Sequence, residues 1–247
     1  MATSLPFFNI APNMRYYMFV LITSVLIAFL GYGTYTTAKL LRTWRPDRNL
    51  ILLPAENILR ILLLPVCVGL GLLSNLPFAQ LGWRINSLLM PVAIQIFAGI
   101  ILGCLLALVF FVSTRWLMNS AGARFYSPTL IDAIVPHNRR QLALVILAMV
   151  PIVLLEELLF RSLLIGGFAP LLPMPALLIG TGILFGVMHS PQGVWGMTGA
   201  GMAGILFGLL FLGFGGLLAP VVAHYIANIV QIGIAMRMQR TDRWTTG

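Results

Sequence analysis

Residues 89–114 read LMPVAIQIFAGIILGCLLALVFFVST, a run of 26 residues without a charged side chain. About 20 apolar residues in an α-helix are enough to cross the hydrocarbon core of a bilayer. The whole chain has the same character, since 60% of its residues are hydrophobic and 9% are charged. So few charges cannot provide the polar surface of a soluble fold of 247 residues. The composition therefore excludes a soluble enzyme and a disordered tail, and it predicts a multi-pass membrane protein.

Six further apolar stretches flank this one along the chain. Membrane spans are expected at residues 17–41, 57–74, 89–114, 143–167, 175–190, 196–213 and 217–236. We expect an all-α bundle of seven transmembrane helices, or eight if the 115–140 loop holds a partial helix. Because no linker interrupts the pattern, residues 1–247 are expected to form a single membrane domain. The stretch 175–190 is short for a span, so it must tilt, extend or cross only in part.

Basic residues lie mainly in alternate connections between these spans. Loops on the cytoplasmic side of a membrane carry an excess of Lys and Arg. Only Arg15 and Arg84 lie on the opposite side, so we expect a bacterial inner-membrane protein with a cytoplasmic C-terminus. The basic clusters are not interleaved with stacking aromatic residues, which argues against nucleic acid as a partner. Eleven basic residues fall on the expected cytoplasmic side: Lys39, Arg42, Arg45, Arg48, Arg115, Arg124, Arg139, Arg140, Arg237, Arg240 and Arg243.

Two local patterns predict contacts between helices. Gly196, Ala200, Gly204 and Gly208 recur every four residues, and small side chains let membrane helices approach closely. We expect this face to pack against another span, although glycine is also common in membrane helices generally. Glu56 and Arg60 are spaced for an ion pair at the start of the second span, either a simple interfacial pair or a feature of substrate entry.

Polar residues inside the later spans need a reason, because an ionised side chain in hydrocarbon costs roughly 2.5–3.5 kcal/mol even on the lenient scale. They occur in three groups, each with a four-residue internal spacing. These are Glu156-Glu157-Leu-Leu-Phe-Arg161, Phe185-Gly-Val-Met-His189 and His224-Tyr-Ile-Ala-Asn228. A single such group is typical of an interhelical hydrogen bond or a Glu–Arg pair that joins helices. Three groups together indicate a functional site.

Helix geometry separates the two glutamates. Glu157 lies one turn from Arg161 and can pair with it. Glu156 is rotated by about 100° and needs another partner. A carboxylate held by an arginine is a weak base, so Glu156 is the better candidate base.

Chain length also places a histidine near Glu156. If the spans 143–167 and 175–190 turn near residues 172–173, Glu156 and His189 lie at roughly equal depth on facing helices. His224 and Asn228 share one face of the last span, where two donors could meet one oxyanion.

The ordered motifs EExxxR, FxxxH and HxxxN resemble those of the CPBP family, which includes the type II CAAX prenyl endopeptidases and bacterial intramembrane proteases of the Abi group. The resemblance covers roughly residues 143–236, the expected catalytic core. It implies an intramembrane endopeptidase of the glutamic type, in which Glu156 and His189 activate a water while His224 and Asn228 stabilise the oxyanion. It also implies that Glu157, Arg161 and Phe185 support the catalytic residues.

Several alternatives stay open at this point. Family members have also been described as metalloproteases, and Glu156, His189 and His224 could hold a zinc ion with an open position. The chain lacks HExxH, so a metal-free site without cofactor is favoured. The expected substrate is a membrane-embedded or lipid-anchored peptide, prenylated or not. A proton-coupled transporter or a non-catalytic immunity protein would use the same buried polar residues differently.

Overall fold

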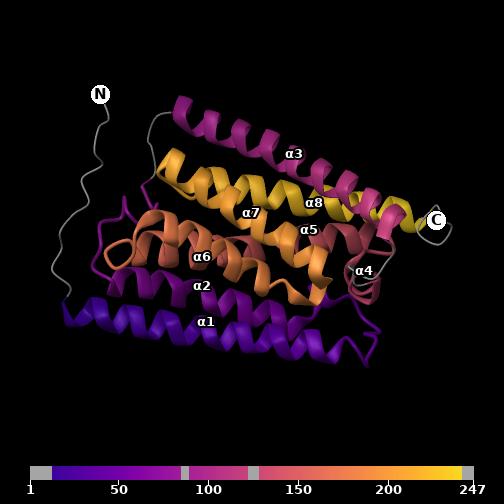
Figure 1. Ribbon diagram of the computed structural model, residues 1–247, viewed down its shortest axis with the longest axis horizontal. Coiled ribbons are helices and arrows are strands. Elements are labelled where there is room, and N and C mark those ends of the chain that lie inside the picture. Colours follow the sequence, from indigo (N-terminus) through magenta and orange to yellow (C-terminus); the bar gives the residue numbers. More distant parts are fainter. Residues whose placement is uncertain (1–12, 85–88, 122–127, 241–247) are drawn as a thin grey trace.

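The computed structural model describes residues 13–84, 89–121 and 128–240, and every regular element in these ranges is helical (Figure 1). The predicted all-α, multi-pass architecture is confirmed. Within the described residues, six helical segments are long and apolar enough to cross a membrane, and α6 is a shorter apolar helix. The elements are α1 (Met14–Leu40), η1 (Leu50–Leu52), α2 (Pro54–Leu73), α3 (Leu89–Ala121), α4 (Pro128–Ile134), α5 (Arg139–Glu157), η3 (Leu158–Gly166), α6 (Met174–Val187), η4 (Ser190–Gln192), α7 (Gly193–Phe214) and α8 (Leu218–Arg240).

The apolar helices run along the long axis of the molecule, and successive connections alternate between its two ends (Figure 1). The α1–α2 connection, α4 and the C-terminal end of α8 gather at one end, which is therefore the basic end of the bundle. Two residues of the charge argument, Arg124 and Arg243, lie outside the described residues. The strongest helix pairings are α3 with α8 and α6 with α7, while α5 lies against both α2 and α8.

The expected spans agree with the helices apart from their ends. The short stretch 175–190 forms α6 over Met174–Val187, and the loop before α5 contains the seven-residue α4, which is too short to span a bilayer. The chain turns between η3 and α6 close to the expected position. Pro173 stands at the N-cap of α6 with an extended backbone, a conformation that ends the preceding turn and starts a new helix.

The helix that begins at α5 changes from α to π geometry at Leu158 and keeps it through Gly166. Most π segments are single turns, and they occur frequently at functional sites. The last carbonyls of this helix accept hydrogen bonds from side chains elsewhere in the fold. The Tyr16 hydroxyl donates to the Gly167 carbonyl at 2.9 Å, and Gln80 Nε2 donates to the Gly166 carbonyl at 3.0 Å. Side chains from the N-terminal part of the chain thus satisfy the last carbonyls of η3.

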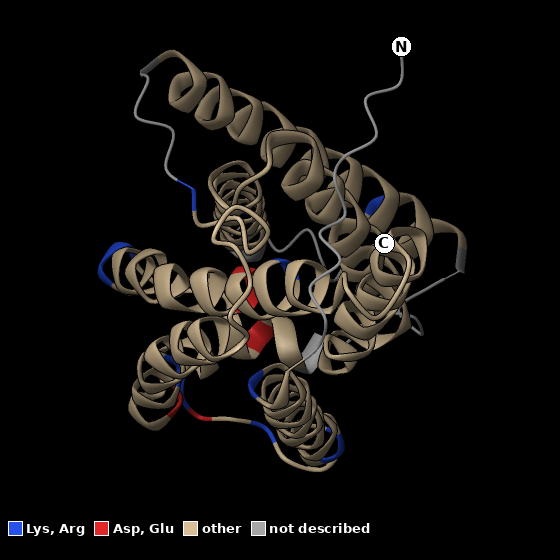
Figure 2. Cartoon of the chain, turned by 90° about the vertical axis from the view of Figure 1, so that its left-hand side faces the viewer, with Lys and Arg blue, Asp and Glu red and all other residues tan. Residues whose placement is uncertain are grey.

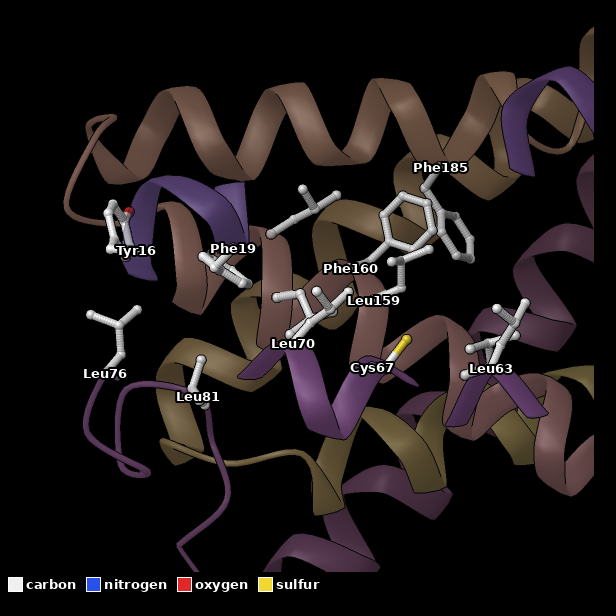
Figure 3. Close-up of a cluster of buried hydrophobic side chains, with 13 residues drawn as sticks. Tyr16, Phe19, Leu63, Cys67, Leu70, Leu76, Leu81, Leu159, Phe160 and Phe185 are labelled. Atoms are coloured by element: carbon white, nitrogen blue, oxygen red, sulfur yellow. The ribbon is translucent and has the colours of Figure 1, made fainter. Parts of the chain in front are cut away.

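The largest apolar core surrounds η3 (Figure 3). Phe19 of α1 and Cys67 of α2 are fully enclosed in it, and Leu159, Phe160 and Leu163 supply the η3 side. Phe185 of α6 closes the core next to Phe160, with ring centroids 4.9 Å apart in an edge-to-face arrangement. This core holds α1, α2, η3 and α6 together directly beside the polar residues of the later spans.

Helices α6 and α7 approach closely through glycines. A Cβ atom on Gly204 would lie 3.1 Å from Phe185 Cβ and 3.3 Å from Gly182 Cα, and one on Gly208 would meet Leu178 and Ile165. The expected helix-packing face is therefore confirmed for Gly204 and Gly208, whereas Gly196 faces Gln192 of its own segment. The same crossing depends on Gly186, whose added Cβ would lie 2.6 Å from the Met197 carbonyl oxygen.

We predict that Gly186→Ala destabilises the protein, because its methyl group would meet rigid backbone of α7 rather than a movable side chain. Overpacking of this kind costs about 1–3 kcal/mol of unfolding free energy. Gly180→Ala is the matched control in the same helix, since nothing lies within 4 Å of the added Cβ. Thermal unfolding in detergent measures both variants. Equal stability of the two would contradict the close α6–α7 crossing.

Candidate active site

Glu157 and Arg161 form an ion pair in the interior of the bundle, as their spacing predicts. Arg161 Nη1 lies 3.1 Å from Glu157 Oε1, and the two side chains are 1% and 0% exposed. Viewed along the bundle, acidic residues lie at its centre between the helices (Figure 2). A buried pair of this kind keeps its charges only where further contacts replace the lost water.

Arg161 obtains those contacts from three aromatic rings and one carbonyl. Its guanidinium carbon lies 5.8 Å from the ring centroid of Phe160, 4.9 Å from Phe185 and 5.2 Å from Phe207. Its Nη2 donates to the Gly204 carbonyl at 3.1 Å. Cation–π contacts are strongest where the cation is desolvated, so this enclosure holds the charge and fixes its position.

His224 of α8 contacts both glutamates. Its Nδ1 lies 2.7 Å from Glu157 Oε1, and its Nε2 lies 3.5 Å from Glu156 Oε2. Since a carboxylate accepts hydrogen bonds, the short contact places a proton on Nδ1 that is donated to Glu157. The ring stacks on Phe207 at 4.9 Å and meets the edge of Phe185 at 5.8 Å. Glu157 therefore fixes the orientation of the imidazole that faces Glu156.

Glu156 reaches the other nitrogen of the same imidazole, and its side chain is 28% exposed. It is the more open of the two carboxylates. Its charge interacts with Arg161 and also with Arg60 of α2. The site thus contains one enclosed glutamate bound to an arginine and one accessible glutamate beside an imidazole.

Glu156 and His189, expected at roughly equal depth on facing helices, form no direct contact. No nitrogen of His189 lies within 4.0 Å of a Glu156 oxygen, and the imidazole that reaches Glu156 is that of His224. His189 follows the end of α6 at Val187, where its Nδ1 donates to the Phe185 carbonyl at 2.7 Å. The depth estimate assumed regular α-helix up to both residues, but η3 is π-helical and α6 stops short of His189.

His189 nevertheless lies beside the site. Its ring is 4.5 Å from that of Phe185, which also touches His224. Because Nδ1 donates to a carbonyl, Nε2 is the nitrogen left to accept a proton. Phe185, which was expected to shape the wall of the site, lies between the two histidines.

Asn228 lies one turn beyond His224 on the same face of α8. Its Nδ2 lies 4.0 Å from Met149 Sδ on α5, a weak contact that leaves most of the amide's hydrogen-bonding capacity unused. His224 and Asn228 share one face of α8, as their spacing predicts, and both contact residues of α5.

The three alternative zinc ligands do not converge. Among the described residues, no group of three His, Cys, Asp or Glu side chains is placed to hold a metal ion. His224 and Glu156 approach each other, but His189 remains with the Phe185 carbonyl. The donor set as positioned does not fit a zinc ion with three protein ligands.

Sequence reasoning missed two parts of the site. Phe207 stacks on His224 and covers Arg161, and the Gly204 carbonyl binds the guanidinium. Both lie on α7, which carries no polar motif. The four-residue glycine spacing marked this helix for close packing, and Gly204 belongs to that pattern.

Residues 138–230 match the family model described as "Type II CAAX prenyl endopeptidase Rce1-like". All seven motif residues, from Glu156 to Asn228, lie inside the matched range. No curated protein matches the chain. No solved structure matches it either.

We predict that Arg161→Met lowers the unfolding free energy by about 3–5 kcal/mol, because it leaves the buried Glu157 without its cation. The double variant Glu157→Gln/Arg161→Met should lose less stability than Arg161→Met alone. Arg60→Met is the control, since the Glu56–Arg60 pair has the same spacing but is partly exposed and contributes about 0–1 kcal/mol. Thermal unfolding in detergent measures all three. A double variant that is no more stable than Arg161→Met would contradict the coupling between the two side chains.

Proposed function

We propose, from the match of residues 138–230 to the family model of Rce1-like type II CAAX prenyl endopeptidases, that this multi-pass membrane protein is a glutamic endopeptidase that cleaves a peptide inside the bilayer. The observation that carries the proposal is the contact of His224 with both Glu156 and Glu157 at the centre of an apolar bundle. An accessible carboxylate beside a fixed imidazole is a general base next to a hydrogen-bond donor.

In this proposal Glu156 is the base. Its partly exposed oxygen takes a proton from a water molecule as the water oxygen adds to the scissile carbonyl carbon. The proton then passes to the leaving amine as the C–N bond breaks, which leaves a carboxylate and an amine. Glu157 is not suited to this role, because Arg161 and His224 already share its Oε1.

His224 and Asn228 are proposed as the oxyanion donors. The contact between His224 Nε2 and Glu156 supports this assignment, because base and oxyanion donor must both border one carbonyl group. A donor role requires a proton on Nε2 as well as on Nδ1.

His189 is proposed to assist the attacking water through its free Nε2. Its bond to the Phe185 carbonyl supports this, since it fixes the ring in the tautomer that can accept a proton there. In this proposal peptide and water lie between His189 and Glu156, which form no ion pair with each other. The substrate is proposed to be a membrane-embedded or lipid-anchored peptide, because the site lies among apolar helices.

We predict that Glu156→Gln lowers cleavage of a membrane-peptide library by about 10²–10⁴-fold or more, because the amide cannot take a proton from water. Its thermal unfolding should remain close to that of the wild type, since Glu156 is partly exposed. Asp47→Asn in the exposed α1–α2 connection is the matched charge-removing control and should cleave normally. Proton-coupled transport by the wild type without any cleavage would favour the transporter hypothesis.

We also predict that activity survives removal of metal ions, because base, histidines and oxyanion donors are all protein groups. The measurement is cleavage after prolonged treatment with 1,10-phenanthroline, with elemental analysis of the treated protein. Persistent activity in metal-stripped protein supports the metal-free mechanism. Loss of activity that zinc restores would overturn it and make His224 a ligand.

A further inference from the structure

Arg60 is a loosely held cation on α2, the helix whose Leu63 packs in one cluster with Leu155 and Leu159, which flank Glu156 in the sequence. Arg60 lies outside the family-matching segment, and its side chain is 24% exposed. Its Nη2 is 3.6 Å from Glu56 Oε2, and its Nη1 donates to Asn57 Oδ1 at 3.4 Å. Both contacts are long, and Glu56 is 51% exposed. An exposed pair of this kind contributes about 0–1 kcal/mol, so another anion can replace Glu56 at little cost.

Two arginines interact electrostatically with Glu156, and they differ in availability. Arg161 is 1% exposed and is covered by Glu157, the Gly204 carbonyl and three rings. Arg60 keeps most of its donors free and makes no ion pair with Glu156 within 4.0 Å. Arg60 can therefore accept an incoming anion near Glu156, whereas Arg161 cannot.

Peptide hydrolysis brings a second carboxylate to this place. Cleavage converts the scissile carbonyl carbon, which must lie beside Glu156, into a carboxylate. A peptide cut near its C-terminus also carries a free carboxylate from the start. Either group would be repelled by Glu156 unless a cation stood close by, and the planar guanidinium binds a carboxylate through two parallel hydrogen bonds.

We propose that Arg60 is a carboxylate-binding residue beside the proposed site, where its guanidinium exchanges Glu56 for a carboxylate of the bound peptide. This rests on the proposed endopeptidase function. The carboxylate is either the free C-terminus of the substrate or the new C-terminus of the product, and both present the same chemistry to Arg60.

The experiment compares peptides that end in a free acid with the same peptides ending in an amide, using the full-length protein in proteoliposomes. Two ratios are measured: kcat/KM of acid over amide substrates, and inhibition by acid over amide forms of the N-terminal cleavage fragment. We expect Arg60→Gln to reduce at least one of these two acid-over-amide ratios by about tenfold or more. Arg60→Lys keeps the charge and should retain part of that preference. Glu56→Gln removes the competing anion and should increase it.

If Arg60→Gln lowers the acid-over-amide ratio of the substrates, Arg60 binds the C-terminus of the substrate. If it lowers only the ratio of the inhibiting fragments, Arg60 binds the carboxylate of the product. Unchanged ratios in Arg60→Gln and Glu56→Gln would overturn the proposal. If Arg60→Gln does not fold, the opposite shifts expected of Arg60→Lys and Glu56→Gln decide the question.

If the wild type cleaves nothing, the endopeptidase function fails. Direct binding of acid and amide peptides to wild type, Glu56→Gln and Arg60→Lys then still tests Arg60.

Discussion

One carboxylate oxygen, Glu157 Oε1, lies at the centre of this fold. It is 3.1 Å from Arg161 Nη1 and 2.7 Å from His224 Nδ1, in a place without solvent exposure. A buried charge is tolerated only while its partners are fixed. The helix α5, the π segment η3 and the helix α8 must therefore keep one relative position. The aromatic cover from α6 and α7 around Arg161 extends the same requirement to those two helices.

This arrangement divides the work between neighbouring glutamates. Glu157 has a structural role, since it orients the imidazole of His224 and neutralises the guanidinium of Arg161. Glu156, one residue earlier, is 28% exposed and makes only a long contact with His224. Two adjacent residues of the same type thus occupy surroundings that differ in exposure and in charge. Helical rotation sends the two side chains in different directions. The packing of α8 then gives them two different chemical environments.

The sequence was informative where local rules decide the outcome. Span positions follow from hydropathy, and the Glu157–Arg161 pair follows from helical spacing. The position of His189 could not be predicted, because it depends on a π segment and on where α6 ends. The choice of His224 as the partner of Glu156 depends on how α8 packs against α5, which no spacing within one helix encodes. Phe207 and the Gly204 carbonyl had no polar motif to mark them.

The π segment also affects how independent the family-matching residues are. Its terminal carbonyls, at Gly166 and Gly167, receive their hydrogen bonds from Gln80 and Tyr16, which lie outside residues 138–230. In hydrocarbon, an unsatisfied carbonyl costs several kcal/mol because no water can replace the donor. The segment that carries every proposed catalytic residue is therefore not a self-sufficient module. Helix α1 and the connection after α2 act together as an intramolecular cofolding partner, and a fragment of residues 138–230 alone would have to find those two donors elsewhere.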